Sequence, residues 1–166
     1  PWPDPARLKT AGIRADCDQY QGQYALYGAP WVPFFHEAAR IIGQENLYVM
    51  MTTDPDVIDA IIGHVVDFGV AVTRRYLEAA GGRIDIAYFG NDFGTQRGLV
   101  ISPAMWQRFI RKPLKRYFDA AHDYGCKVMQ HSCGAIRDIV PFLIEDGVDI
   151  LNPIQVRAAG MDPARL

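Results

Sequence analysis

One histidine and one cysteine lie two positions apart in the sequence, at His131 and Cys133. Side chains two positions apart on an extended segment point to the same side, so an imidazole nitrogen and a thiolate sulfur can reach one cation there. Zinc accepts both ligand types, and a catalytic zinc usually has three protein ligands and one open position. The pair predicts a zinc site whose third protein ligand lies outside this chain. The alternative interpretation is a hydrogen-bonded histidine beside a small buried thiol.

Further polar residues lie in two loops that follow expected strands. Asp92 stands in a loop with two glycines, where backbone amides can approach a ligand closely. Its carboxylate can orient a cationic substrate group or act as a general acid or base; the alternative is an aspartate that only stabilises its own turn. Gln96 and Gln155 can bind substrate or satisfy nearby backbone groups. We expect Asp92 to be catalytic and all three residues to contact substrate.

Aromatic residues follow the first expected strand. Trp31 and Phe35 can form the apolar wall of a substrate pocket, with a place in the hydrophobic core as the alternative for each.

Glycines and prolines divide the chain into alternating strands and helices. Short apolar runs predict strands at 24–27, 84–89, 127–131 and 148–151. Helical spacing, caps and first-turn prolines predict four helices. One ends at Ile42, and one runs from Pro55 to about Leu77. One runs from Pro103 to about Tyr124, where Pro113 should kink it or divide it in two, and one runs from Ile136 to Glu145 with an interruption at Pro141.

This order of elements, with strands that are apolar on both sides, predicts an α/β fold with a parallel sheet covered by helices. Four strands are half of a closed (β/α)8 (TIM) barrel, which takes about 250 residues. We therefore expect one domain over 1–166 that holds about half of a barrel and is truncated at both ends. In such folds the loops after the carboxyl ends of the strands carry the active site, and the candidate residues lie in those loops.

Composition excludes several classes of protein. The chain has 17 basic and 19 acidic residues, a net charge of −2, which disfavours nucleic-acid binding. Hydrophobic residues make up 49% and charged residues 22%, as in globular proteins with a core. The longest apolar runs are far shorter than the roughly 18 residues of a membrane-spanning helix. The three cysteines form no disulfide framework and no signal peptide is recognisable, so we expect a cytoplasmic protein with free thiols.

Several motifs together resemble the uroporphyrinogen decarboxylase superfamily. They are Gly-Ala-Pro-Trp (28–31), Gly-Asn-Asp-Phe-Gly-Thr-Gln (90–96), Ile-Ser-Pro (101–103), Lys-Pro-Leu-Lys (112–115), His-Ser-Cys-Gly (131–134) and Gly-Val-Asp-Ile-Leu-Asn-Pro-Ile-Gln (147–155). The resemblance lies in their order and spacing and covers most of the chain. It implies a (β/α)8 barrel of roughly twice this length, with a substrate cleft at the carboxyl end of the barrel.

The resemblance implies one of two chemistries. In the methyltransferase branch a His-x-Cys pair and a later Cys bind zinc, and the enzyme exchanges methyl groups with a corrinoid protein; His131 and Cys133 match the first two ligands. Uroporphyrinogen decarboxylases work without metal or organic cofactor and are not expected to have this pair. They rely on an arginine-rich segment and an aspartate that would precede Pro1.

Our leading hypothesis is therefore zinc-dependent methyl transfer to or from a corrinoid protein, with a small-molecule substrate. The alternatives are cofactor-independent decarboxylation of uroporphyrinogen, in porphyrin biosynthesis, and a non-catalytic barrel that binds a corrinoid carrier. The resemblance also suggests a homodimer, whereas nucleic acid and membrane are not expected as partners.

Overall fold

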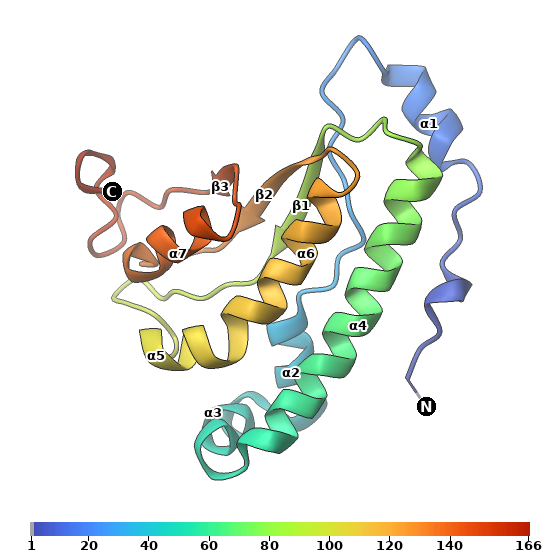
Figure 1. The fold of residues 1–166 in the computed structure, drawn as a ribbon. Coiled ribbons are helices and arrows are strands. Elements are labelled where there is room, and N and C mark those ends of the chain that lie inside the picture. The colour runs from blue at the N-terminus through green and yellow to red at the C-terminus, as the bar shows by residue number, and fades with distance from the viewer. Residues whose placement is uncertain (1) are drawn as a thin grey trace.

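The computed structural model describes residues 2–166, apart from the side chain of Arg165. Its sheet has three parallel strands in the order β1 (Ile86–Gly90), β2 (Lys127–His131) and β3 (Ile150–Asn152). Each strand connects to the next through helices, as Figure 1 shows. The structure thus confirms the α/β fold and the parallel sheet expected for part of a (β/α)8 barrel.

The expected strand at 24–27 is reduced to a single bridge to the sheet. Tyr27 pairs in parallel with Ile86 of β1, and the N–H of Gly28 donates to the Ile86 carbonyl at 3.0 Å. The N–H of Leu26 instead donates to the carboxylate of Asp85 at 2.7 Å, so this backbone group is not free to form a ladder. The segment still occupies the position of a fourth strand beside β1.

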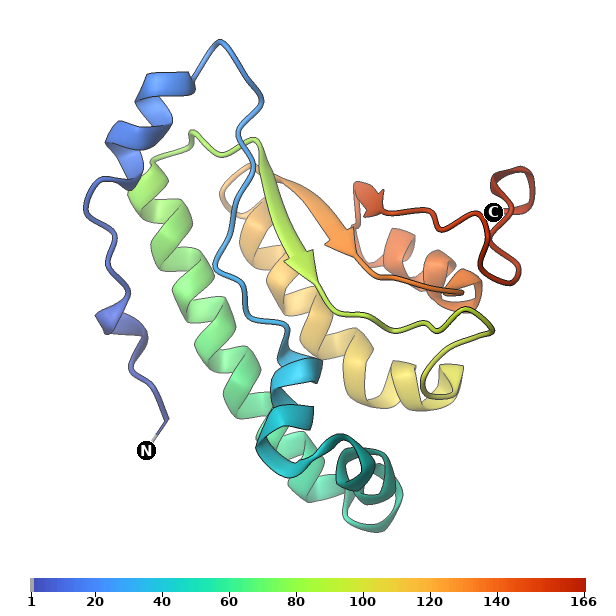
Figure 2. The ribbon, with the colours of Figure 1, turned by 180° about the vertical axis from the view of Figure 1, so that it is seen from behind.

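Helices cover only one face of the sheet. Figure 1 shows α4 (Pro55–Ala80), α6 (Lys112–His122) and α7 (Val140–Glu145) on this face, and Figure 2 shows the opposite face without helices. The burial of the strands alternates accordingly: Ala87 and Val128 are fully buried toward the helices, while Tyr88 is partly exposed on the other face. The sequence predicted strands that are apolar on both sides and a sheet covered by helices. In the described residues the burial of the strands alternates, and helices cover one face, as in the wall of a (β/α)8 barrel.

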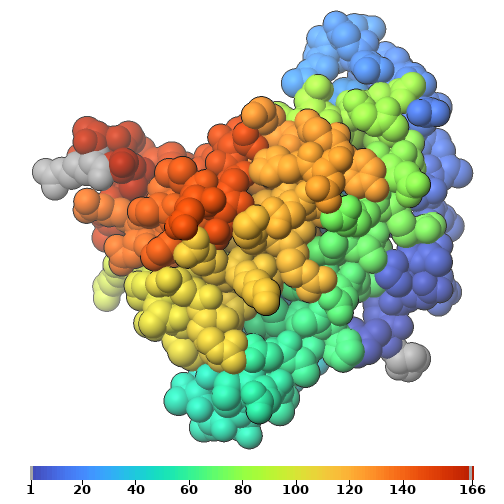
Figure 3. Space-filling model, viewed as in Figure 1, coloured from blue at the N-terminus to red at the C-terminus, as the bar shows by residue number. Residues whose placement is uncertain are grey.

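The long helix α4 and the helices after β1 lie side by side and parallel. Asp59, Asp67 and Arg74 of α4 pair with residues 49 positions later, in the ion pairs Asp59–Arg108, Asp67–Arg116 and Arg74–Asp123. A constant separation along two helices requires that both run in the same direction. Figure 3 shows these helices packed into a continuous outer surface together with α7.

Two prolines determine how the expected helices are interrupted, and the interruption expected near Pro113 is observed. The helix expected at 103–124 is divided into α5 (Pro103–Trp106), a π-helical turn (Gln107–Arg111) and α6, because Pro113 lacks the N–H that a regular helix needs. Pro141 lies in the first turn of α7, after a 3₁₀ turn at Arg137–Ile139, so it begins a helix and does not interrupt one.

Before α4, the described residues hold a 3₁₀ turn (Pro5–Arg7) and three α-helices. The expected helix ending at Ile42 is α2 (Phe34–Ile42), and α1 (Ile13–Tyr20) is the short helix of the N-terminal region. The helix α3 (Gln44–Thr53) was not expected, because Gly43 ends α2 and at the same time precedes α3 with a φ of 87°. Within the described residues, no helix combines the length and apolar character needed to cross a bilayer.

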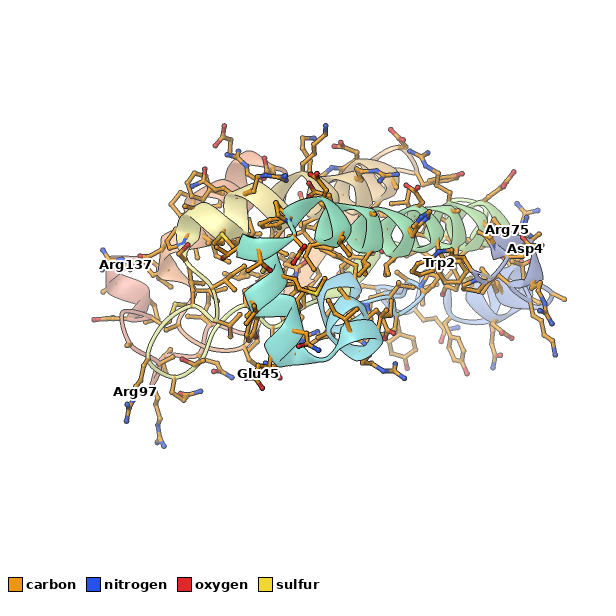
Figure 4. The ribbon with its side chains drawn as sticks, turned by 90° about the horizontal axis from the view of Figure 1, so that it is seen from below. Trp2, Asp4, Glu45, Arg75, Arg97 and Arg137 are labelled. Carbon is orange, nitrogen blue, oxygen red and sulfur yellow. The ribbon has the colours of Figure 1, made fainter. Side chains whose placement is uncertain are left out.

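The N-terminal segment lies along α4. The ring of Trp2 stacks on His64 at a centroid distance of 4.9 Å, and the Arg75 side chain donates to the carbonyl of Ala6. Trp2, Asp4 and Arg75 are found on this side in Figure 4, and Arg97, after β1, extends outward from the far end.

Candidate metal centre

The loops after β1, β2 and β3 meet at the carboxyl edge of the sheet. The N–H of Asn91 donates to the His131 carbonyl at 3.1 Å, and the N–H of Ser132 donates to the Asn152 carbonyl at 3.0 Å. These bonds continue the parallel ladder by one residue beyond β1 and β2. Side chains from three separate parts of the sequence are thereby fixed next to one another.

Asp92, His131 and Cys133 form a cluster at this edge. The Nε2 atom of His131 lies 3.3 Å from Asp92 Oδ1 and 3.6 Å from Cys133 Sγ. One possible ligand atom from each residue lies within 4.8 Å of the other two. The two residues predicted to bind metal are therefore brought together, and the carboxylate predicted to be catalytic joins them as a third donor.

Backbone contacts hold the cluster in place. The N–H of Cys133 donates to Asp92 Oδ1 at 2.8 Å. Gly134 has a φ of 87°, and a Cβ atom there would lie 2.3 Å from the carbonyl carbon of Gly94. Only glycine allows the loops after β1 and β2 to approach this closely.

The electrostatics of the cluster favour a bound cation. Burial raises the pKa of the Cys133 thiol, and the negative charge and hydrogen bond of Asp92 raise it further, while a hydrogen bond from Gln155 acts in the opposite direction. The pKa of Tyr88 is raised by burial and then by the charges of Tyr27, Asp92 and Cys133. The causes of both shifts include no neighbouring positive charge.

The remaining predicted site residues divide between the site and the core. Gln155 Oε1 accepts hydrogen bonds from the N–H of Gly134 at 2.8 Å and from Gln96 Nε2 at 3.2 Å, so both glutamines join the loops beside Cys133. Trp31 is 57% exposed and stacks on Tyr88, whose ring contacts His131 edge to face at 6.2 Å.

Phe35 lies deeper than Trp31. It is 3% exposed and packs on the rings of Tyr48 and Phe93. It also lines a cavity of about 240 Å³ that extends to His36 and Asp92. The two aromatic residues predicted to form one wall thus lie in different surroundings, and it is Phe35 that shares a cavity with Asp92.

Two residues at the site were not recognised from the sequence as parts of a metal centre. Asn152 Oδ1 lies 3.0 Å from His131 Nδ1, and Tyr88 packs against the same imidazole. Tyr88 carried no separate signal, because it lies within the apolar run that predicted the strand. The signal for Asn152 was its position at the end of the strand next to His131.

The fold and the position of the cluster define a class: parallel β/α units with a polar site at the carboxyl edge of the strands. Residues 13–153 match the model of the uroporphyrinogen decarboxylase (URO-D) family, and the chain belongs to this family. No curated relative matches the sequence at a significant level.

Among solved structures, a methyltransferase from Methanosarcina mazei has a similar fold, with 12% sequence identity and a TM-score of 0.67. The match covers 86% of this chain and 40% of that chain. This chain thus spans about two fifths of the length of the methyltransferase, and the likeness concerns the fold.

The donor set of the cluster fits zinc. An imidazole nitrogen, a thiolate sulfur and a carboxylate oxygen are the three atom types that bind zinc in proteins. The side chains of His131 and Asp92 are 25% and 45% exposed, so the cluster is accessible from solvent and yet anchored at the end of the sheet. Asp92 supplies a third donor within the chain, whereas the sequence led us to expect the third ligand outside it.

Proposed function

We propose that this chain contributes the zinc site of a URO-D family methyltransferase that transfers a methyl group to or from a corrinoid protein. The observation that carries the proposal is the convergence of donor atoms from Asp92, His131 and Cys133. The fold shared with a methyltransferase supports it. The family match supports an enzyme of this superfamily in general.

His131, Cys133 and Asp92 are the residues that would hold zinc. Zinc, when bound, supplies a Lewis acid that stabilises a thiolate at neutral pH or polarises the heteroatom that carries the methyl group. Without a cation the Cys133 thiol keeps its proton at neutral pH, because burial and Asp92 both raise its pKa. Metal binding at this site must therefore release that proton.

The residues around the cluster would position substrate. Asp92 faces both His131 and the cavity that Phe35 lines, so a small molecule in this cavity would extend to the donor atoms. Gln155 and Gln96 hold the loop of Cys133, and the exposed ring of Trp31 provides an apolar surface next to Tyr88. We propose that a corrinoid protein docks over this edge of the sheet and that the full-length protein is a homodimer.

Metal analysis of the purified full-length protein tests the zinc site. We expect about one zinc per protein in the wild type and none in the double variant His131→Ala, Cys133→Ala. The matched control is His64→Ala, Cys17→Ala, which removes the same residue types from helices away from the cluster and should retain zinc. A wild type without zinc, or full occupancy in the first variant, would refute the proposed site.

Decarboxylation of uroporphyrinogen is the second candidate, favoured by the match to the URO-D family model. Asp92 would then interact with pyrrole N–H groups, and arginines outside this chain would pair with the substrate carboxylates. Turnover of uroporphyrinogen by metal-free protein would support decarboxylation. Association with a corrinoid carrier but no methyl transfer would instead identify a non-catalytic barrel.

A further inference from the structure

We propose that Asn152 is a positioning residue that makes Nε2 of His131 the metal-facing nitrogen; this inference rests on the proposed zinc site. The Nδ1 atom of His131 lies 3.0 Å from the amide oxygen of Asn152. Both ring nitrogens face an oxygen that only accepts hydrogen bonds, but the oxygen of Asn152 is the closer one, and Asp92 Oδ1 already accepts the Cys133 N–H. We therefore assign the proton of the neutral imidazole to Nδ1. Nε2 then keeps its lone pair and faces Cys133 Sγ at 3.6 Å and Asp92 Oδ1 at 3.3 Å.

The sheet holds Asn152 in this position. His131 and Asn152 are register partners on the adjacent parallel strands β2 and β3. The carbonyl of Asn152 also accepts the N–H of Ser132 at 3.0 Å. The residue is thus fixed through its backbone, and its side chain is directed to the imidazole from a rigid element and not from a loop.

The bond to Asn152 determines how well the site is organised before a metal arrives. Among the described residues, Asn152 is the hydrogen-bond partner of His131 Nδ1, and the ring of Tyr88 packs edge to face against the imidazole. Without the amide, the imidazole can place its proton on Nε2 or turn about its bond to Cβ. Either change removes the lone pair from the side of Cys133 and Asp92, and loss of such outer partners typically weakens metal affinity about 10–100-fold.

The tautomer of His131 can be measured in the metal-free full-length protein by long-range ¹H–¹⁵N NMR. We expect the proton on Nδ1 in the wild type and in Asn152→Asp, whose carboxylate accepts the same bond. In Asn152→Leu we expect a shift toward the Nε2-protonated form. An Nε2-protonated wild type, or an unchanged tautomer in Asn152→Leu, would overturn the inference.

Zinc affinity, measured by competition with a chelator, provides the second readout. Asn152→Leu should bind about 10–100-fold more weakly than wild type, and Asn152→Asp should recover the affinity. The control Gln19→Leu removes an exposed amide from α1, at the opposite end of the molecule (Figure 1), and should bind as the wild type does. Circular dichroism verifies that each variant is folded. If Asn152→Leu does not fold, the role of Asn152 is tested by the tautomer of His131 in the wild type and by the zinc affinity of Asn152→Asp.

The two proposals fail in different ways. A wild type that binds no zinc refutes the proposed function, while the tautomer in metal-free protein still tests the role of Asn152. A wild type that binds zinc, together with an Asn152→Leu variant of equal affinity, refutes the role of Asn152 and leaves the zinc site intact.

Discussion

At the scale of single residues, the carboxylate of Asp92 connects the parts of the candidate site. One of its oxygens accepts the N–H of Cys133 and also faces the imidazole of His131. The same negative charge raises the pKa of the Cys133 thiol. The aspartate therefore opposes formation of a free thiolate but favours a cation between the three side chains, because the cation neutralises both negative groups.

The effect of this charge can be tested with Asp92→Asn. Removing the charge should lower the pKa of Cys133, since Asp92 is the second-largest cause of its upward shift, and burial should keep it above the ordinary value. The pH profile of alkylation at Cys133 in metal-free protein should then shift to lower pH. Cys126, whose pKa is raised by its own burial, is the internal control that should not change. Peptide mass spectrometry separates the two thiols, and an unchanged Cys133 profile would contradict the assignment.

A second residue-scale prediction concerns the contact between loops. Gly134→Ala places a Cβ atom 2.3–2.6 Å from backbone atoms of Gly94 and Thr95, at a φ of 87°. We expect a loss of about 2–3 kcal/mol in the free energy of unfolding, measured by urea denaturation. Gly98→Ala is the matched control, because its Cβ atom meets nothing within 4 Å. Equal stability of the two variants would show that the loops do not approach as closely as the structure indicates.

The sequence alone predicts only part of the candidate site. The spacing of His131 and Cys133 is local, so it predicted two donors directly. The contact of Asp92 with Cys133 joins residues 41 positions apart, and that of Asn152 with His131 joins residues 21 apart. Such contacts depend on strand register and on the height at which each loop leaves the sheet, which no local pattern specifies.

At the scale of elements, the amino ends of the strands carry stabilising contacts and the carboxyl ends carry the candidate site. Asp85 and Asp149 each lie one residue before the start of a strand, within Ile84-Asp85-Ile86 and Val148-Asp149-Ile150. Each carboxylate accepts a backbone N–H from the preceding strand segment, from Leu26 at 2.7 Å and from Val128 at 2.8 Å. The amino edge of the sheet thus repeats one stabilising contact, and the carboxyl edge carries the candidate chemistry.

Asp149 gives this edge a predictable pH dependence. Lys127, the N–H of Val128 and His122 hold the pKa of Asp149 well below its usual range. A carboxyl group with a lowered folded-state pKa stabilises the protein above its unfolded-state pKa of about 3.9, and this stability is lost as the pH falls toward the folded-state value. Asp149→Asn should therefore lower the free energy of unfolding at pH 7 by about 1 kcal/mol. As the pH falls from about 5 to 3, the free energy of unfolding should decrease less in this variant than in the wild type.

Urea denaturation at a series of pH values measures this difference. The control Asp123→Asn removes a carboxylate that is 56% exposed and paired with Arg74 on the helical surface, and it should change stability by less than about 0.5 kcal/mol. Parallel pH profiles for the wild type and Asp149→Asn would contradict the role given to Asp149.

The elements themselves were largely predictable where one local signal determined them. The strand at 127–131 was predicted with its observed bounds, and Gly81, with a φ of 62°, stops α4 close to the predicted end. The helix α3 was missed because Gly43 was interpreted only as a stop. The strand at 24–27 was predicted too long because the competing bond of Leu26 to Asp85 is a tertiary contact.

At the scale of the whole molecule, the sheet has one covered face and two unprotected edges within the described residues. On one side β3 pairs only with β2, and on the other Tyr27 pairs with β1, while the only other bridge of this segment is the local one between Tyr24 and Gln21. Tyr24 and Tyr27, at this second edge, are 67% and 68% exposed. In a closed barrel further strands would pair with both edges, consistent with the match to only 40% of the methyltransferase chain.

These edges predict how residues 1–166 behave when expressed alone. Unpaired strand edges next to exposed aromatic rings promote association, so we expect the isolated chain to be largely oligomeric at micromolar concentration in light scattering after gel filtration. Tyr24→Lys with Tyr27→Lys should reduce this association, because charged side chains oppose edge-to-edge pairing. Val49→Lys is the control: Val49 is 54% exposed but lies on α3, away from the sheet edges, so the same charge should leave association unchanged. A monomeric wild-type chain, or equal effects of the edge and helix substitutions, would show that the open sheet edges do not drive the association.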